Sequence, residues 1–189
     1  MKKIVYILPA LLLFLINAQT GISQEWNAAR LTILYGSNIP FNFNTLEKIK
    51  NGIEIAVGTQ IGISMADSNQ VGHDLEGFDL NFKSFNGQTE IRGEVYTLPL
   101  NRIRVRAVNS LGLGAGTSYG YQDLTTGWTP LFSYTNAAWS DLNWANHQLT
   151  ISYECGRPAP AGNGSLLGEE PDYYNVEIEF ELIPTGPGF

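Results

Sequence analysis

Residues able to perform acid–base or nucleophilic chemistry are sparse in this 189-residue chain. The histidines are His73 and His147, and the single cysteine is Cys155. GTSYG, residues 116–120, has the spacing G-x-S-x-G, but no amphipathic helix follows it to form a nucleophile elbow, and no H-E-x-x-H motif places two zinc ligands on a helix. His147 and Cys155 fall along or beside one predicted strand, without an orienting third group. We therefore predict that the protein is not an enzyme. A hydrolase with two dispersed carboxylates is an alternative, because the spacing of such a pair is spatial rather than sequential.

Two short stretches resemble ligand-binding loops, and each lacks required positions. In GLGAG, residues 112–116, Thr117 replaces the third glycine of the dinucleotide fingerprint, and no amphipathic helix follows. In DSNQVGHDLE, residues 67–76, the fifth position of a calcium loop is Val71, and the twelfth is Phe78. We predict no cofactor and no metal ion. A looser cation site is the open alternative, with the ligands Asp67, Asp74 and Glu76.

Aromatic side chains gather in one part of the sequence, at Tyr119, Tyr121, Trp128, Phe132, Tyr134, Trp139 and Trp144. Bulky residues of this kind fill the core of a protein without disulfides, and we favour that interpretation. Exposed aromatic faces also stack on sugar rings. A carbohydrate-binding module is therefore the alternative function, with a glycan as partner and Tyr119, Tyr121, Trp128, Trp139 and Trp144 as its contacts.

Charged side chains form two matching rows. Arg102, Arg104 and Arg106 alternate with apolar residues, so their guanidinium groups share one face of a predicted strand. The same rhythm returns near the end of the chain at Glu177, Glu179 and Glu181. Opposite charges on neighbouring strands stabilise their pairing. We predict that the two rows meet, either within one molecule or between subunits; two unrelated solvated faces are the alternative.

Runs of alternating or β-branched residues, separated by Gly, Asn, Asp and Pro, predict an all-β sandwich or barrel. Gly58 falls between two of these runs and marks a bulge or bend rather than a strand break. The predicted strands are 30–35, 53–57, 59–65, 76–83, 89–98, 102–108, 148–154 and 174–183.

One short helix is predicted in FNTLEKIKNGI, with Asn44 as its N-cap, Glu47 reaching back to the cap and Gly52 as its stop. Residues 109–127 and 156–172 are rich in Gly, with Ser and Thr in the first and Pro in the second. They predict long surface loops, where binding residues often lie.

The first residues predict an export signal. Lys2 and Lys3 precede an apolar run from Ile4 to Ile16, which is shorter than the about 20 residues of a membrane-spanning helix. We predict a signal peptide over 1–23, with cleavage after Ala18 or Ser23, and one domain over 24–189. The predicted location is the periplasm, the outer surface or the extracellular medium, without stable insertion into a membrane.

Net charge and cysteine content limit the partners and the covalent cross-links that the mature chain can have. Without the two lysines of the leader, nine basic side chains remain against 18 acidic ones, so the mature chain is unsuited to nucleic acid. Because Cys155 is the only cysteine, no intramolecular disulfide can form, and the fold must rely on core packing. We expect Cys155 to be a half-buried apolar residue; pairing of two chains through it is the alternative.

From Gln148 onward, the sequence reads QLTISYECG, then a Gly/Pro loop, and then SLLGEEPDYYNVEIEFELIP. This arrangement resembles the closing hairpin of secreted bacterial β-sandwich proteins of the spore coat U and fimbrial-subunit type. Tyr173 and Tyr174 take the place of the tyrosine before the last strand, and Pro171-Asp172 the place of the usual turn. PFNFNTLEKIKNGIEI is similar to the first strands of secreted proteins from the Bacteroidetes group. The resemblance implies an immunoglobulin-like antiparallel sandwich at or outside the cell surface.

The final predicted strand carries the functional prediction. Val176, Ile178, Phe180 and Leu182 alternate with polar residues, so the strand has one apolar face to bury. We expect it to complete its own sheet; donation to a neighbouring molecule is the alternative. The predicted function is that of a secreted structural or adhesive surface component that self-associates through a sheet edge, with copies of itself or other surface proteins as partners.

Overall fold

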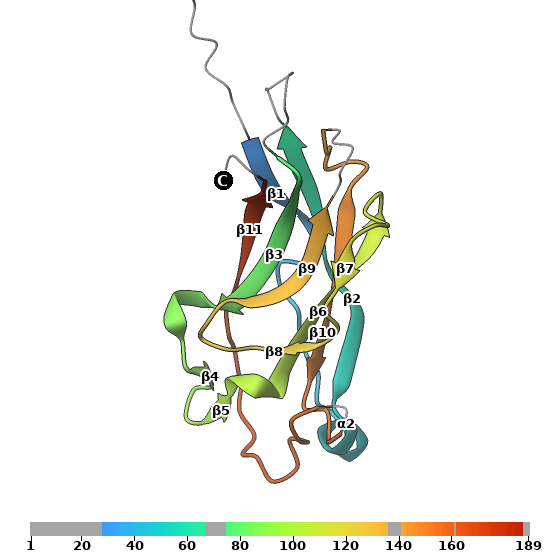
Figure 1. The fold of residues 1–189 in the computed structure, drawn as a ribbon. Helices are drawn as coiled ribbons and strands as arrows, with labels where there is room; N and C mark the ends of the chain where they lie inside the picture. The colour runs from blue at the N-terminus through green and yellow to red at the C-terminus, as the bar shows by residue number, and fades with distance from the viewer. Residues whose placement is uncertain (1–27, 67–74, 136–140, 161, 187–189) are drawn as a thin grey trace, which may run out of the picture.

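The computed structural model describes residues 28–66, 75–135, 141–160 and 162–186. In these residues two antiparallel sheets pack face to face, as a β-sandwich does (Figure 1). The first sheet has the strand order β1-β2-β10-β6-β8 and consists of β1 (Ala28–Tyr35), β2 (Ile53–Ala66), β10 (Gln148–Cys155), β6 (Ile103–Leu111) and β8 (Gln122–Asp123). The second has the order β11-β3-β9-β7 and consists of β11 (Ile178–Thr185), β3 (Gly77–Ser84), β9 (Thr129–Thr135) and β7 (Thr117–Ser118).

The core lies between the two sheets. Along β3, Phe78, Leu80 and Phe82 are fully buried, and the residues between them are less so, as the period-2 pattern predicts. The ring centroids of Phe78 and Phe132 are 6.3 Å apart, so aromatic residues of adjacent strands fill the centre of the core. Cys155 is a buried free thiol. The expectation that packing replaces disulfides is therefore consistent with the described core.

The two predicted strands around Gly58 are one strand, β2, with an irregularity at this glycine. The register with β10 shifts between Ile151↔Thr59 and Tyr153↔Ile55, which is a bulge at the predicted position. A Cβ at Gly58 would lie 2.5 Å from Cδ2 of Tyr153, so the tyrosine ring packs on the bare backbone.

The terminal strand serves its own sheet. β11 pairs with β3 along its whole length, from Ile178↔Ser84 to Thr185↔Gly77. It begins four residues later than predicted, because Asn175 bridges to Arg92 instead. The predicted inward residues Val176, Ile178, Phe180 and Leu182 are partly buried against the core. They are less enclosed than expected because β11 is an edge strand.

The prediction of a single strand over 89–98 is wrong. These residues form a two-stranded hairpin of β4 (Glu90–Arg92) and β5 (Thr97–Pro99). The chain reverses between them, where Gly93 N donates to Tyr96 O over 2.8 Å. Alternation continues through the turn, so the sequence pattern conceals it.

The predicted helix is present as α2 (Leu46–Asn51), and Gly52 ends it with φ of +74°. Its N-cap is Thr45, not Asn44: Oγ1 of Thr45 accepts from Lys48 N, while Oδ1 of Asn44 accepts from Lys48 Nζ. Two 3₁₀ turns follow later, η2 (Phe85–Gly87) and η3 (Leu100–Arg102).

The loop predictions hold only in part. β6 extends to Leu111, and β7 and β8 are short strands inside the predicted loop 109–127. β9 was not predicted as a strand. The described residues of 156–172 contain no helix or strand, as predicted. The predicted signal peptide lies outside the described residues, and among the residues described no helix is long and apolar enough to cross a membrane.

Candidate functional site

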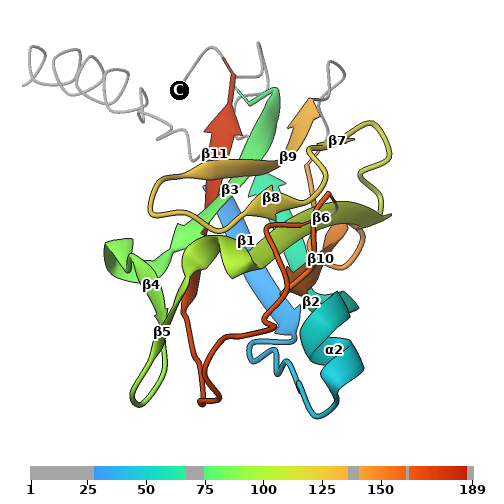
Figure 2. The ribbon, with the colours of Figure 1, turned by 90° about the horizontal axis from the view of Figure 1, so that it is seen from below.

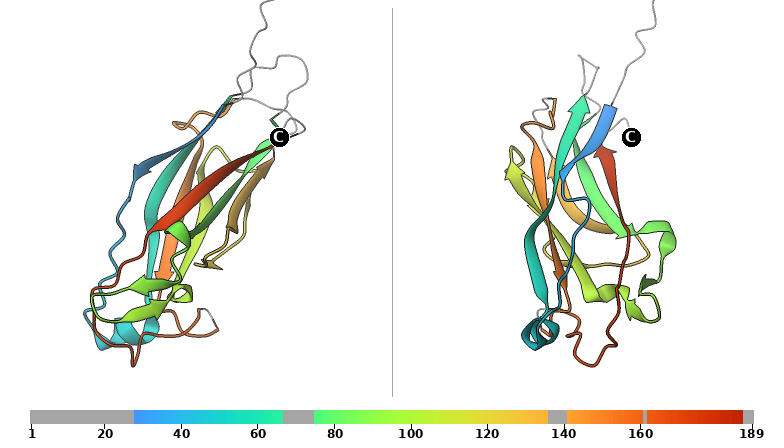
Figure 3. Two further views of the ribbon diagram at one scale, coloured as in Figure 1. Left: turned by 90° about the vertical axis from the view of Figure 1, so that its left-hand side faces the viewer. Right: turned by 180° about the vertical axis from the view of Figure 1, so that it is seen from behind.

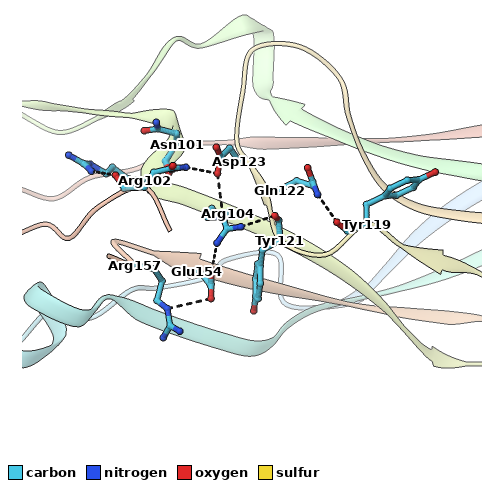
Figure 4. A network of polar contacts seen from close by, with 10 residues as sticks. Asn101, Arg102, Arg104, Tyr119, Tyr121, Gln122, Asp123, Glu154 and Arg157 are labelled. Carbon is cyan, nitrogen blue, oxygen red and sulfur yellow. Dashed lines mark hydrogen bonds and ion pairs between the residues drawn. The ribbon is translucent and has the colours of Figure 1, made fainter. Parts of the chain in front are cut away.

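The densest group of charged side chains lies on the outer face of the first sheet and is centred on Arg104 of β6. Its Nη1 lies 3.2 Å from Oε2 of Glu154, and its Nε lies 3.3 Å from Oδ1 of Asp123. Its Nη2 donates to the carbonyl oxygen of Tyr121 over 2.9 Å (Figure 4). Sheet pairing creates this arrangement, because Arg104 lies opposite Glu154 of β10 and Asp123 of β8.

Glu154 is the most enclosed carboxylate of this group, with 5 % of its side chain exposed. Desolvation raises the pKa of Glu154 above its ordinary value, while Arg157 and Arg104 act to lower it. Nε of Arg157 lies 3.5 Å from Oε1 of Glu154. The carboxylate is thus enclosed between two guanidinium groups, which compensate its charge in this partly desolvated position.

The ring of Tyr121 packs against the arginine side chains of β6. The guanidinium carbon of Arg106 lies 4.5 Å from its ring centroid, and its hydroxyl donates to Oε1 of Glu54 over 2.9 Å. Burial, followed by the hydrogen bond to Glu54, raises the pKa of Tyr121 to about 12. Tyr121 therefore stays neutral at physiological pH and connects β8 to the outer face of β2 and β6.

Arg102 attaches the loop 156–172 to this network. Its Nη2 lies 2.8 Å from Oε1 of Glu169, and its Nη1 donates to the carbonyl oxygen of Asn163 over 2.5 Å. Nδ2 of Asn163 in turn donates to Oδ1 of Asp123. The predicted surface loop is thus tied to β6 and β8 by charged side chains.

The two predicted charge rows do not meet within the molecule. The arginines lie on or beside β6 of the first sheet, whereas β11 belongs to the second. Glu179 pairs instead with Lys83 on β3, with 3.5 Å between Nζ and Oε2. Glu177 and Glu181 form no ion pair within the described part of the chain. Contact of the rows between subunits remains a prediction.

The predicted aromatic residues lie on different elements. Tyr121 packs on the arginines, and Tyr119 is exposed beside it, with its carbonyl oxygen accepting from Gln122. Trp128, 39 % exposed, lies under Nζ of Lys83 on the second sheet, 4.1 Å from the ring centroid. Trp144, 49 % exposed, contacts the backbone of Gly62 on β2. Trp139 lies outside the described residues. The described ones are thus spread over both sheets, and the carbohydrate-binding alternative stays a prediction.

His147 and Cys155, which were considered as a catalytic pair, lie at opposite ends of β10. His147 precedes β10, and its Nδ1 contacts the backbone N of Asn143 at 2.9 Å, whereas Cys155 ends the same strand. Burial raises the pKa of Cys155 to about 12, so its thiol is a poor nucleophile at neutral pH. Asp67, His73 and Asp74 lie outside the described residues, and the described ones contain no group of three metal-ligating side chains.

A cleft that the sequence did not predict opens at one side of the sandwich. It has a volume of about 1410 Å³ and lies between the extended segments 36–44 and 172–178. Figure 2 shows these segments from below, one leading to α2 and the other to β11. Their sequence signal is apolar alternation in segments that are mostly outside the regular strands. Ile39, Phe41 and Phe43 lie in the first segment, and Tyr174 and Val176 lie in the second.

Comparison with known proteins adds no relative to this picture. No protein-family model matches the chain, and no curated protein matches it. The resemblance to spore coat U and fimbrial-subunit proteins therefore stays a prediction from the sequence.

Proposed function

We propose that the protein is an exported, non-enzymatic structural or adhesive component that self-associates through an open sheet edge. The observation that carries this proposal is the position of β11. It pairs with β3 on one side over eight residues and is the outermost strand of its sheet.

A free edge strand presents a row of unpaired backbone N–H and C=O groups, which is a template for an added strand. β1 is the outermost strand of the first sheet and contacts β11 (Figure 3). The two free edges therefore share one side of the molecule. A strand of a second copy that added there would extend a sheet without unfolding either molecule.

Export and the immunoglobulin-like topology belong to the same proposal. The basic and apolar leader supports export, and the two packed antiparallel sheets are compatible with the proposed topology. The charge network supports the non-enzymatic part, because its carboxylates and guanidinium groups are engaged with one another.

Sedimentation velocity over a range of concentrations tests the proposal, with Ile183→Lys as the edge variant. Ile183 lies on β11 and is 39 % exposed, and charged lysines on edge strands oppose strand addition. We expect larger species as the wild-type concentration rises, and a shift of this transition to higher concentration in the variant.

Leu167→Lys is the matched control, because it adds the same charge at an exposed apolar residue outside the strands. It should behave as the wild type does. A protein that stays monomeric throughout, or two lysine variants with equal effects, would contradict assembly through β11.

A further inference from the structure

The cleft at the side of the sandwich has apolar walls that the fold leaves incompletely covered. Phe41 and Phe43 stack at 6.4 Å between ring centroids on one wall, and Val176 and Ile178 form the other. All four are only partly buried. The floor consists of buried residues from several strands, including Ile91, Leu98, Ile103 and Cys155. Partly exposed apolar side chains that line a concave surface are a common feature of ligand sites.

The rim of the cleft offers hydrogen-bond donors. From Ser37 to Phe41, no backbone group makes a hydrogen bond to the residues that the structure describes. The N–H groups of this extended segment are therefore free to bind a ligand, except at Pro40, which has none.

Lys48 adds a positive charge to the same rim. Its Nζ lies 2.9 Å from Oδ1 of Asn44 and 3.4 Å from the carbonyl oxygen of Asn42, both uncharged acceptors. Within the described ranges, no carboxylate lies at ion-pair distance from it. The ammonium group is thus positioned at the cleft and electrically uncompensated.

Two acidic side chains, Asp172 and Glu177, also line the cleft. Both carboxylate oxygens of Asp172 accept from backbone amides, Oδ2 from Val95 and Tyr96 and Oδ1 from Tyr173. Glu177 is exposed, in alternation with the partly buried Val176 and Ile178. Among the described lining residues Lys48 is the only basic side chain, so the place for an anionic group of a ligand is beside Lys48, next to the apolar walls.

We propose that this cleft binds a long-chain carboxylate, with its alkyl chain between the aromatic and aliphatic walls and its carboxylate near Lys48 and the free amides of 37–41. A cleft of about 1410 Å³ exceeds the usual size of a small-molecule site, so it has room for such a chain. This binding is independent of assembly through β11.

Equilibrium dialysis with isotope-labelled oleate, kept below its aggregation limit, tests the proposal. We expect the wild type to bind oleate, and Val176→Trp to lose it because the indole fills the cleft. Lys48→Gln should weaken oleate binding by about tenfold, the loss of one charge-assisted hydrogen bond, and leave oleyl alcohol unaffected. Lys50→Gln, on the same helix but outside the cleft lining, is the matched control and should bind oleate as the wild type does.

Absence of oleate binding by the wild type, or equal losses in Lys48→Gln and Lys50→Gln, would overturn the proposal. Loss of self-association rather than of oleate binding in Val176→Trp would also overturn it and would identify a second copy as the occupant.

Discussion

Arg104 and Arg106 occupy equivalent positions on β6 but have different surroundings. Arg104 contacts two carboxylates and a carbonyl oxygen, and one of those carboxylates is almost fully enclosed. Arg106 stacks on Tyr121 and has no carboxylate partner among the described residues. Two arginines of one sequence pattern are therefore expected to contribute unequally to stability.

Replacement by methionine, which keeps the apolar part of the side chain, measures this difference. Arg104→Met should lower the free energy of unfolding by about 1.5–3 kcal/mol, since it leaves the charged Glu154 short of a donor. Arg106→Met should cost only about 0.5–1 kcal/mol, the magnitude of a cation–π contact. Urea unfolding with unchanged m-values measures both, and equal losses would contradict the network described above.

The β4–β5 hairpin is held to the segment before β11 by one carboxylate. Oδ2 of Asp172 accepts from the amides of Val95 and Tyr96 in the turn, and Asn175 pairs with Arg92. The hydrogen bonds from Tyr96 and then Val95 lower the pKa of Asp172 to about 2. The ionised form is thus the one that joins the two elements.

The stability contributed by Asp172 should depend on pH with a defined sign. Because its folded pKa is about 2 and the ordinary value is 3.8, the contribution is complete above that ordinary value and is lost as pH falls through about 2. Asp172→Asn should therefore unfold at lower urea than the wild type at pH 6, and the difference should shrink at pH 3. A difference independent of pH would show that the carboxylate charge is not involved.

Alternating or β-branched runs were sufficient to predict β1, β2, β3, β6 and β10; β2, β3, β6 and β10 bury residues in the core, and β1 packs against it through the partly buried Leu31. The pattern failed at 89–98, where the same alternation continues through a turn at Gly93. It also missed β9, a short strand that contains Pro130 and was not among the predicted strands. Pattern alone reports which residues face inward and does not report where a strand reverses.

The site was less predictable than the fold for a physical reason. Arg104 meets Asp123 and Glu154 only through strand pairing, and 50 residues separate Arg104 from Glu154 in the chain. The matching alternation of Glu177, Glu179 and Glu181 did not show that these residues belong to the other sheet, so contact with the arginines within one molecule was not excluded from the sequence. The cleft depends on two extended segments that lie largely outside the regular strands, a property that alternation cannot indicate.

At the scale of the whole molecule, the sandwich is open on one side. β1 and β11 both end their sheets there, and the cleft lies between the segments that follow β1 and precede β11. One free edge suits a second polypeptide, and the cleft suits an amphiphile of low molecular weight. The two proposals therefore assign different ligands to the same open side of the sandwich.

Amide hydrogen exchange across β11 tests assembly most directly, because alternate backbone amides of an antiparallel edge strand point away from its neighbour. In dilute protein, the amides of 178–185 that face β3 should be protected, and those that face outward should exchange rapidly. At concentrations where larger species form, we expect the outward amides to become protected as well. Rapid exchange of those amides within the assembled species would contradict self-association through this edge.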